Sequence, residues 1–133
     1  ATPEDLQAAK RIFDSVGLTV ILEEAQMDAV TALAGSGPAF VYRFIDALTQ
    51  GGVETGLPHD VAAKLALATV EGAAKLAATS SESPATLAAR VTSPGGTTAA
   101  GLAVLDEDDA LQRLVTATLG AARDRGADLA KGM

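Results

Sequence analysis

Residues 59–79 read HDVAAKLALATVEGAAKLAAT, and this stretch decides the fold class. Apolar or small residues recur along it at helical spacing and share one face: Val61, Leu65, Ala68, Gly72 and Leu76. The small residues allow another helix to approach closely. We therefore predict a long helix that starts after Gly56-Leu57-Pro58-His59-Asp60, ends near Thr79 and packs against other helices.

Helical patterns continue on both sides of this stretch. Upstream, residues 24 to about 50 follow a helical pattern that is interrupted at Gly35-Ser36-Gly37-Pro38 and is expected to end at Gly51-Gly52. Downstream, we expect a short helix over 84–91, a helix from 97 to about 105, and a last helix that begins within Asp106–Asp109. The chain from Glu23 onward is therefore predicted to be all-α.

The N-terminal residues have a different pattern. Thr2-Pro3-Glu4-Asp5 is a favourable helix start, and Gly17 is expected to end that helix. Leu18-Thr19-Val20-Ile21-Leu22 is the only β-branched apolar run in the chain, so it predicts one short strand. Because a lone strand needs a neighbour for its backbone groups, we expect the rest of a sheet to lie outside this sequence.

Composition excludes several classes of function. The 133 residues carry a net charge of −7, which argues against a nucleic-acid partner. There is no cysteine and only one histidine, so we expect no metal site. No apolar run approaches the roughly 20 residues of a membrane span, and residues 1–5 do not resemble a signal segment. We expect a cytoplasmic protein, and the missing initiator Met suggests an excised or processed piece.

Three motifs have ordinary structural interpretations. Gly35-Ser36-Gly37-Pro38-Ala39-Phe40 begins like a dinucleotide fingerprint but has Phe40 at the third glycine position, so we interpret it as a helix kink. His59 is expected to be a solvated residue in the first turn of a helix. The acids Asp106–Asp109 suit a helix N-terminus and lack the ligand pattern of a calcium loop.

The stretch Thr92-Ser93-Pro94-Gly95-Gly96-Thr97-Thr98 has a more specific pattern. Two adjacent glycines before a helix let the backbone fold its N–H groups around one point, at the positive end of the helix dipole. Such a loop suits a small carboxylate or phosphate, and four hydroxyls supply further donors. The alternative is an elaborate Ser/Thr-Pro helix cap, and the residues alone leave both interpretations open.

The residues around this loop resemble a known family. Residues 91–102, VTSPGGTTAAGL, closely resemble the signature loop of pyrroline-5-carboxylate reductase, and residues 28–40, DAVTALAGSGPAF, resemble a second stretch of that family in the right order and spacing. The shorter runs Asp46-Ala47-Leu48, Gly51-Gly52-Val53 and Gly56-Leu57-Pro58 also fit. The resemblance covers essentially the whole chain.

The resemblance implies an oxidoreductase of proline biosynthesis, which reduces 1-pyrroline-5-carboxylate to L-proline with NADPH or NADH. It also implies that residues 1–22 are the last helix and strand of a Rossmann-like dinucleotide-binding domain, and that residues 23–133 are an all-helical dimerisation and substrate-binding domain. The cofactor would then be bound mainly by a domain absent from this sequence, so we expect the chain alone to be inactive.

The resemblance further implies the roles of individual residues. Thr98 matches a threonine whose hydroxyl lies near the ring nitrogen of the substrate, and it is the expected catalytic residue. Arg90 is the expected cofactor-binding residue. The other residues expected to bind substrate are Glu24, Ser93, Gly95, Gly96 and Thr97.

The expected partner is a second copy of the chain. Two predicted helices, near 39–48 and 61–76, are apolar or alanine-rich around most of their circumference, and one chain of this length cannot cover both. We therefore expect an interlocked homodimer, which could assemble further into an oligomer of dimers. Two alternatives to a reductase part stay open: a catalytically silent dimerisation module, and a carboxylate-binding protein without the cofactor domain.

Overall fold

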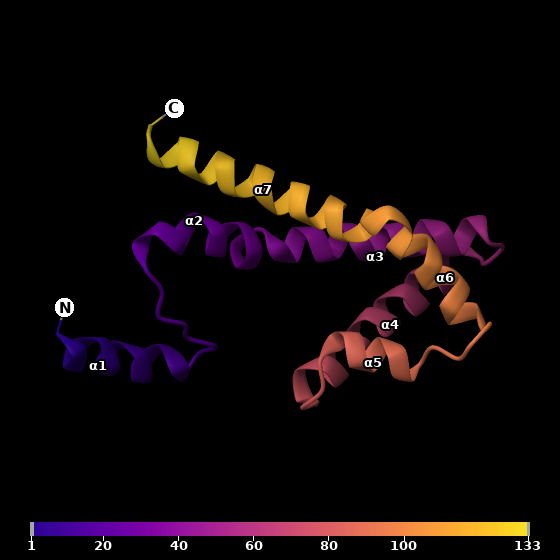
Figure 1. The fold of residues 1–133 in the computed structure, drawn as a ribbon, viewed down its shortest axis with the longest axis horizontal. Coiled ribbons are helices and arrows are strands. Elements are labelled where there is room, and N and C mark those ends of the chain that lie inside the picture. The colour runs from indigo at the N-terminus through magenta and orange to yellow at the C-terminus, as the bar shows by residue number, and fades with distance from the viewer. Residues whose placement is uncertain (1, 133) are drawn as a thin grey trace.

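The computed structural model describes residues 2–132, and every regular element in that range is helical (Figure 1). The helices are α1 (Pro3–Asp14), α2 (Met27–Val30), α3 (Gly37–Glu54), α4 (His59–Thr79), α5 (Pro84–Arg90), α6 (Thr97–Asp106) and α7 (Ala110–Ala130). Three short helical segments lie between them: η1 (Glu24–Gln26), η2 (Thr31–Gly35) and η3 (Glu107–Asp109). The predicted all-α class is confirmed.

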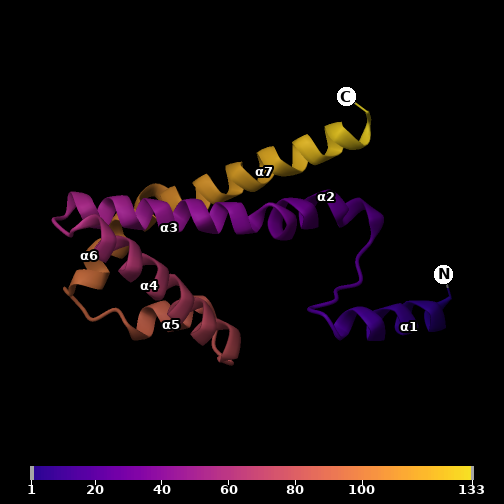
Figure 2. The same cartoon turned by 180° about the vertical axis from the view of Figure 1, so that it is seen from behind.

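The strand predicted over residues 18–22 is wrong, because this segment is irregular. Its backbone has no second strand to pair with among the described residues, so the β-branched run alone does not produce a strand. The helix before it forms as predicted: Thr2 accepts a hydrogen bond from the Asp5 N–H at 3.2 Å. Both views place α1 apart from the other helices (Figures 1 and 2).

The segments α2, η2 and α3 follow one another as a long rod, bounded by residues 27 and 54 (Figure 1). The predicted kink is a π-helical turn, in which the Ser36 N–H donates to the Thr31 carbonyl at 2.9 Å. In a regular α-helix the Pro38 ring would clash with the carbonyl of residue 34, and the wider turn relieves that clash.

The predicted end of this helix at Gly51-Gly52 is wrong, since α3 continues to Glu54. Gly52 lies where α3 crosses α4: a Cβ there would be 3.1 Å from the Cβ of Ala62. The glycine therefore allows a close helix approach instead of ending the helix. Ala62, Ala66 and Thr49 are buried in this region.

The last helix begins later than the acids Asp106–Asp109 predicted. Asp108 and Asp109 have positive φ angles of 49° and 57°, and α7 starts only at Ala110. Aspartate tolerates this left-handed conformation better than most residues. The acids therefore form a bend between α6 and α7, after which α7 extends to contact α2 and η2 (Figure 1).

Candidate functional site

The predicted carboxylate loop, residues 92–98, connects α5 to the first turn of α6. The Gly96 N–H donates to the Ser93 carbonyl at 3.0 Å, which closes a four-residue turn. Pro94 occupies the second position of the turn, and Gly95 has a φ of 69° at the third. This arrangement is typical of a type II turn, which requires glycine or asparagine at the third position.

Gly96 is needed for a different reason. It is the N-cap of α6, with an extended backbone at φ −80° and ψ 173°, which any residue adopts. However, a Cβ at this position would collide with the Ser93 hydroxyl and lie 3.2 Å from the Ser93 carbonyl oxygen. The two glycines therefore have separate roles: Gly95 makes the turn, and Gly96 allows it to pack tightly.

The start of α6 has unused backbone donors. The first helical bond is made by the Ala100 N–H, which donates to the Gly96 carbonyl at 3.1 Å, and no side chain caps the helix. The N–H groups of Thr97, Thr98 and Ala99 precede that bond and have no partner within the helix. The helix-cap alternative is therefore not realised in the structure, and the geometry suits an anion at the positive end of the helix dipole.

Two side-chain contacts stabilise the C-terminal end of α5, just before the loop. The Thr92 hydroxyl donates to the Ala88 carbonyl at 2.7 Å, and the Arg90 guanidinium forms an ion pair with Glu82 at 2.5 Å. Arg90 thus already has a partner in the chain, and its side chain is exposed. The sequence pattern did not indicate Glu82, because a separation of eight positions from Arg90 is not a helical spacing that would identify the pair.

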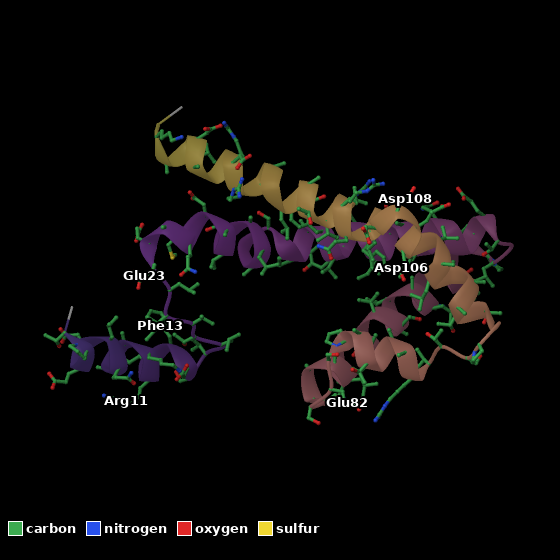
Figure 3. All side chains as sticks on the ribbon, viewed as in Figure 1. Arg11, Phe13, Glu23, Glu82, Asp106 and Asp108 are labelled. Atoms are coloured by element: carbon green, nitrogen blue, oxygen red, sulfur yellow. The ribbon has the colours of Figure 1, made fainter. Side chains whose placement is uncertain are left out.

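The structure brings together five of the six residues predicted to bind substrate, but not the sixth. Ser93, Gly95, Gly96, Thr97 and Thr98 lie in one loop, whereas Glu24 lies in η1, next to α2. Figure 3 labels the neighbouring Glu23 at the α2 end of the rod, far from α6 and the loop before it. One chain therefore does not place Glu24 beside the carboxylate loop.

Other features add no further chemistry to this site. His59 is exposed in the first turn of α4, as predicted. Within residues 2–132, no group of three or more His, Cys, Asp or Glu side chains is arranged to hold a metal ion. None of the helices described is both long enough and apolar enough to cross a membrane.

Comparison with known proteins identifies the family. A family model for pyrroline-5-carboxylate reductase dimerisation matches residues 24–129. The pyrroline-5-carboxylate reductase of Synechocystis is 48% identical over 129 residues, which are 97% of this chain and 48% of that protein. The enzyme of Pisum sativum is 44% identical over 92% of this chain and 45% of its own length. The chain thus spans about half the length of these relatives.

Solved structures show the same similarity. A pyrroline-5-carboxylate reductase from Coxiella burnetii matches with a TM-score of 0.88 and 35% identity, over 97% of this chain and 48% of that one. The Plasmodium falciparum pyrroline carboxylate reductase, solved with NADP bound, matches with a TM-score of 0.79 and 34% identity, over 94% of this chain and 50% of that one. The chain therefore belongs to the pyrroline-5-carboxylate reductase family, through its dimerisation domain.

Proposed function

We propose that this chain is the substrate-binding and dimerisation part of a reductase that converts 1-pyrroline-5-carboxylate to L-proline. The observation that carries the proposal is the start of α6, where a glycine turn leaves the N–H groups of Thr97, Thr98 and Ala99 without helical partners. Residues 1–22 would complete a dinucleotide-binding domain, and residues 23–133 would form the dimerising domain.

In this proposal the loop holds the substrate by its carboxylate. Backbone N–H groups at a helix start donate to an anion without a charged side chain, and the hydroxyls of Ser93 and Thr97 can add further donors. Fixing the carboxylate fixes the ring, so that one face of C5 is presented for reduction. The loop would therefore contribute orientation as well as affinity.

Thr98 would act at the other end of the substrate. Reduction adds a hydride to C5 and a proton to the ring nitrogen of the C=N bond, which gives the secondary amine of proline. A hydroxyl that donates to, or relays a proton toward, this nitrogen makes C5 more electrophilic. No titratable side chain of the loop could do this instead, because residues 92–98 contain none.

The described residues do not form a dinucleotide site by themselves. The chain has no glycine fingerprint, and Arg90, the predicted cofactor-binding residue, is paired with Glu82. We propose that NADPH or NADH, which supplies the hydride when bound, is held mainly by another domain of the enzyme. The chain alone should then be inactive.

The separation of Glu24 from the loop supports a pocket shared between chains. If Glu24 and the loop contribute to the same substrate pocket, they must come from different copies of the chain. Within one copy, η1 and the loop before α6 lie far apart (Figure 3). The proposed homodimer would supply that second copy, and an oligomer of such dimers would be compatible with it.

A chimera tests the proposal. The cofactor domain of a relative would be joined to residues 23–133 of this chain, and NADPH oxidation would be followed with and without pyrroline-5-carboxylate. We expect substrate-dependent oxidation in the chimera and none with residues 1–133 alone. A folded, NADPH-binding chimera that does not oxidise NADPH would favour the silent dimerisation module instead. NADPH oxidation by the chain alone would contradict the proposal that another domain holds the cofactor.

A further inference from the structure

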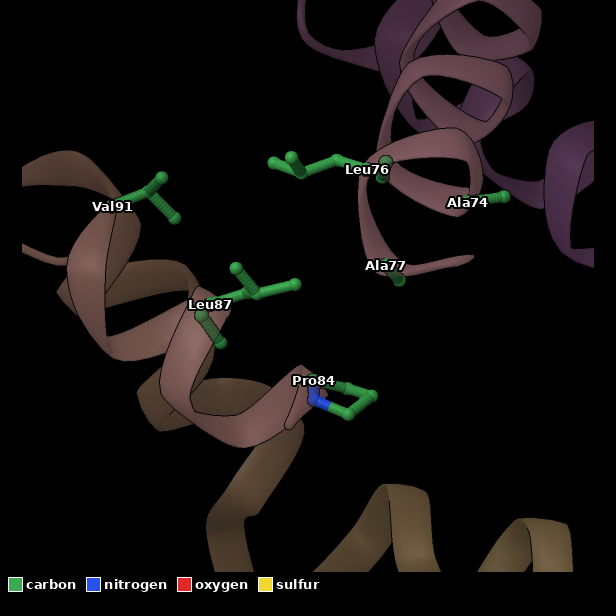
Figure 4. A pocket seen from close by; sticks show the side chains of 8 residues that line it. Ala74, Leu76, Ala77, Pro84, Leu87 and Val91 are labelled. Carbon is green, nitrogen blue, oxygen red and sulfur yellow. The ribbon is translucent and has the colours of Figure 1, made fainter. Parts of the chain in front are cut away.

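The helix that precedes the carboxylate loop is short. α5 has seven residues and none of them is buried. An isolated helix shorter than about 12 residues is marginal in water. Between α4 and α5 lies an open groove of about 420 Å³, and Figure 4 shows Leu76 of α4 on one side of it and Leu87 and Val91 on the other. Within one chain, polar contacts rather than apolar packing therefore set the orientation of α5.

A series of polar contacts connects the end of α4 to the end of α5. The Ser80 N–H donates to the Leu76 carbonyl at 2.9 Å, and the Ser80 hydroxyl accepts a hydrogen bond from the Glu82 N–H at 3.0 Å. The Glu82 carboxylate then pairs with the Arg90 guanidinium at 2.5 Å. This ion pair spans α5 from the turn before it to its last residue.

The Glu82–Arg90 pair differs from the other ion pairs among the described residues, which join positions at most four apart. It links a turn to the far end of a helix. The Glu82 side chain is 25% exposed and that of Arg90 is 67% exposed. Ion pairs with such exposure add little to the stability of a fold. We therefore expect this pair to act on local geometry.

The geometry at the end of α5 is passed directly to the loop. The Thr92 N–H donates to the Ala89 carbonyl at 3.2 Å, and the Thr92 hydroxyl donates to the Ala88 carbonyl at 2.7 Å. These bonds attach the first residue of the loop to the last turn of α5. The next residue is Ser93, whose carbonyl accepts the Gly96 N–H and closes the turn. A displacement of the last turn of α5 would therefore displace this turn as well.

We propose that Glu82 is a positioning residue, which holds the carboxylate loop in place through its ion pair with Arg90. This inference rests on the proposed function, because it assigns Glu82 to the same substrate site. Glu82 would not touch the substrate; it would fix the end of α5, where the loop starts. The loop would hold the carboxylate throughout the reaction, so a displaced loop should raise the KM for the substrate and leave kcat nearly unchanged.

Hydrogen exchange in residues 1–133 tests the position of the loop without substrate. We would compare Glu82→Gln with Asp124→Asn, which removes the same charge and breaks the exposed 2.6 Å ion pair with Arg123 on α7. Loss of an exposed ion pair changes a local equilibrium by up to about fivefold. In Glu82→Gln, we expect the Gly96 N–H to exchange about two- to fivefold faster than in the parent. In Asp124→Asn it should not change, and the amides of α4 should not change in either variant.

Steady-state kinetics of the chimera with a cofactor domain test the consequence for the substrate. We expect Glu82→Gln and Arg90→Gln each to raise the KM for pyrroline-5-carboxylate about two- to fivefold, with kcat and the KM for NADPH nearly unchanged. The double variant should be no worse than the single variants, because either substitution already breaks the pair. Asp124→Asn is again the control and should match the parent.

The outcomes separate this proposal from the proposed function. Unchanged exchange of the Gly96 N–H in Glu82→Gln, or equal acceleration of the α4 amides, would overturn the positioning role. A higher KM for NADPH alone in Arg90→Gln would assign Arg90 to the cofactor and would also overturn it. An inactive parent chimera would contradict the proposed function, but the exchange of the Gly96 N–H would still decide whether Glu82 positions the loop.

Discussion

The crossing of α3 and α4 and the α5–α6 segment are stabilised in different ways. The crossing is built from small residues that touch within one chain: Gly52 faces Ala62, and Ala62, Ala66 and Thr49 are buried there. The α5–α6 segment contains no buried residue at all. It nevertheless carries the loop over residues 92–98, which we propose binds the carboxylate of the substrate.

This difference indicates that contacts within one chain fix the α3–α4 crossing, whereas α5 and α6 need contacts with a partner chain. Close packing of small residues orients α3 and α4 without help. The proposed substrate site instead lies between α5 and α6, whose residues one chain does not bury. Changes at the crossing should therefore alter stability, whereas changes in the loop should alter binding and catalysis.

The largest effect is expected from Thr98→Ala in an enzyme that carries the cofactor domain. Loss of one oriented donor at the reacting nitrogen should raise the barrier by about 2–4 kcal/mol, which lowers kcat/KM by roughly 30- to 1,000-fold. Steady-state kinetics measure this, and thermal unfolding should be nearly unchanged. Thr55→Ala is the control, because the Thr55 hydroxyl bonds only to the Gly51 and Gly52 carbonyls of its own helix. Similar kinetics for the two variants would show that Thr98 has no role in the reaction.

The next largest effect is expected at the crossing, from Gly52→Val. The new side chain would meet Ala62, whose Cβ would be only 3.1 Å from the added Cβ, and overpacking of this kind costs about 1–3 kcal/mol. Urea unfolding at a fixed protein concentration measures the loss. In the control Gly51→Val, the added Cβ would have no neighbour within 4 Å, so no such loss is expected. Equal stabilities would mean that α3 and α4 do not cross as described.

The dependence of stability on protein concentration tests whether α5 and α6 need a partner chain. If folding and association are one event, tenfold dilution should lower the apparent free energy of unfolding by about 1.4 kcal/mol per dimer. Thermal unfolding at several concentrations measures the shift in Tm. A Tm that is independent of concentration, in a protein with the mass of one chain, would show that α5 and α6 are stable without a partner.

An effect of similar size is expected from Gly95→Ala. Its φ of 69° costs a residue with a Cβ about 1–2 kcal/mol, so the turn between Ser93 and Gly96 should open. We expect weaker substrate binding with unchanged NADPH binding, measured by titration of the enzyme with each ligand. Gly101→Ala, in the middle of α6 with no neighbour within 4 Å of the added Cβ, is the matched control. Equal substrate affinity in both variants would argue against an anion site in this turn.

The elements that the sequence predicted well are those determined by local periodicity. The bounds of α4 follow from its alanine-rich pattern, and the α1 start follows from Thr2 and Pro3. The loop residues 93–98 were identified as a group because adjacent glycines before a helix are unusual unless the backbone needs them.

The elements that the sequence did not predict depend on contacts distant in the chain. The strand over 18–22 would need a partner strand, and the extension of α3 through Gly51-Gly52 depends on Ala62. The bend at Asp108 and Asp109 depends on backbone angles that a row of acids does not predict. In the proposed homodimer, Glu24 of one chain and the loop of the other share a pocket. Their relative position then depends on how two chains associate, which the periodicity of one chain does not predict.

The smallest effect concerns the starts of two helices. In α1, the Thr2 N–H donates to the Asp5 carboxylate at 2.9 Å, and this bond, together with the Thr2 hydroxyl, lowers the pKa of Asp5 from its usual value. In α6, no side chain caps the first turn. The start of α1 should therefore respond to acid through Asp5, whereas the start of α6 should not respond through any group of its own.

The direction of this response follows from linkage. Because the folded pKa of Asp5 is lowered, the capping contribution is fully present above the unfolded pKa of about 3.9 and is lost as the pH falls through the folded value. NMR titration should show the amide signals of the first turn of α1 shifting below pH 4, together with the Asp5 carboxyl signal. In Thr2→Ala, which removes the hydroxyl and keeps the N–H, the pKa of Asp5 should rise part of the way toward its usual value. The amides of Thr97 and Thr98 serve as the internal control, and a transition there with the same midpoint would show that the acid response is global unfolding rather than loss of the cap.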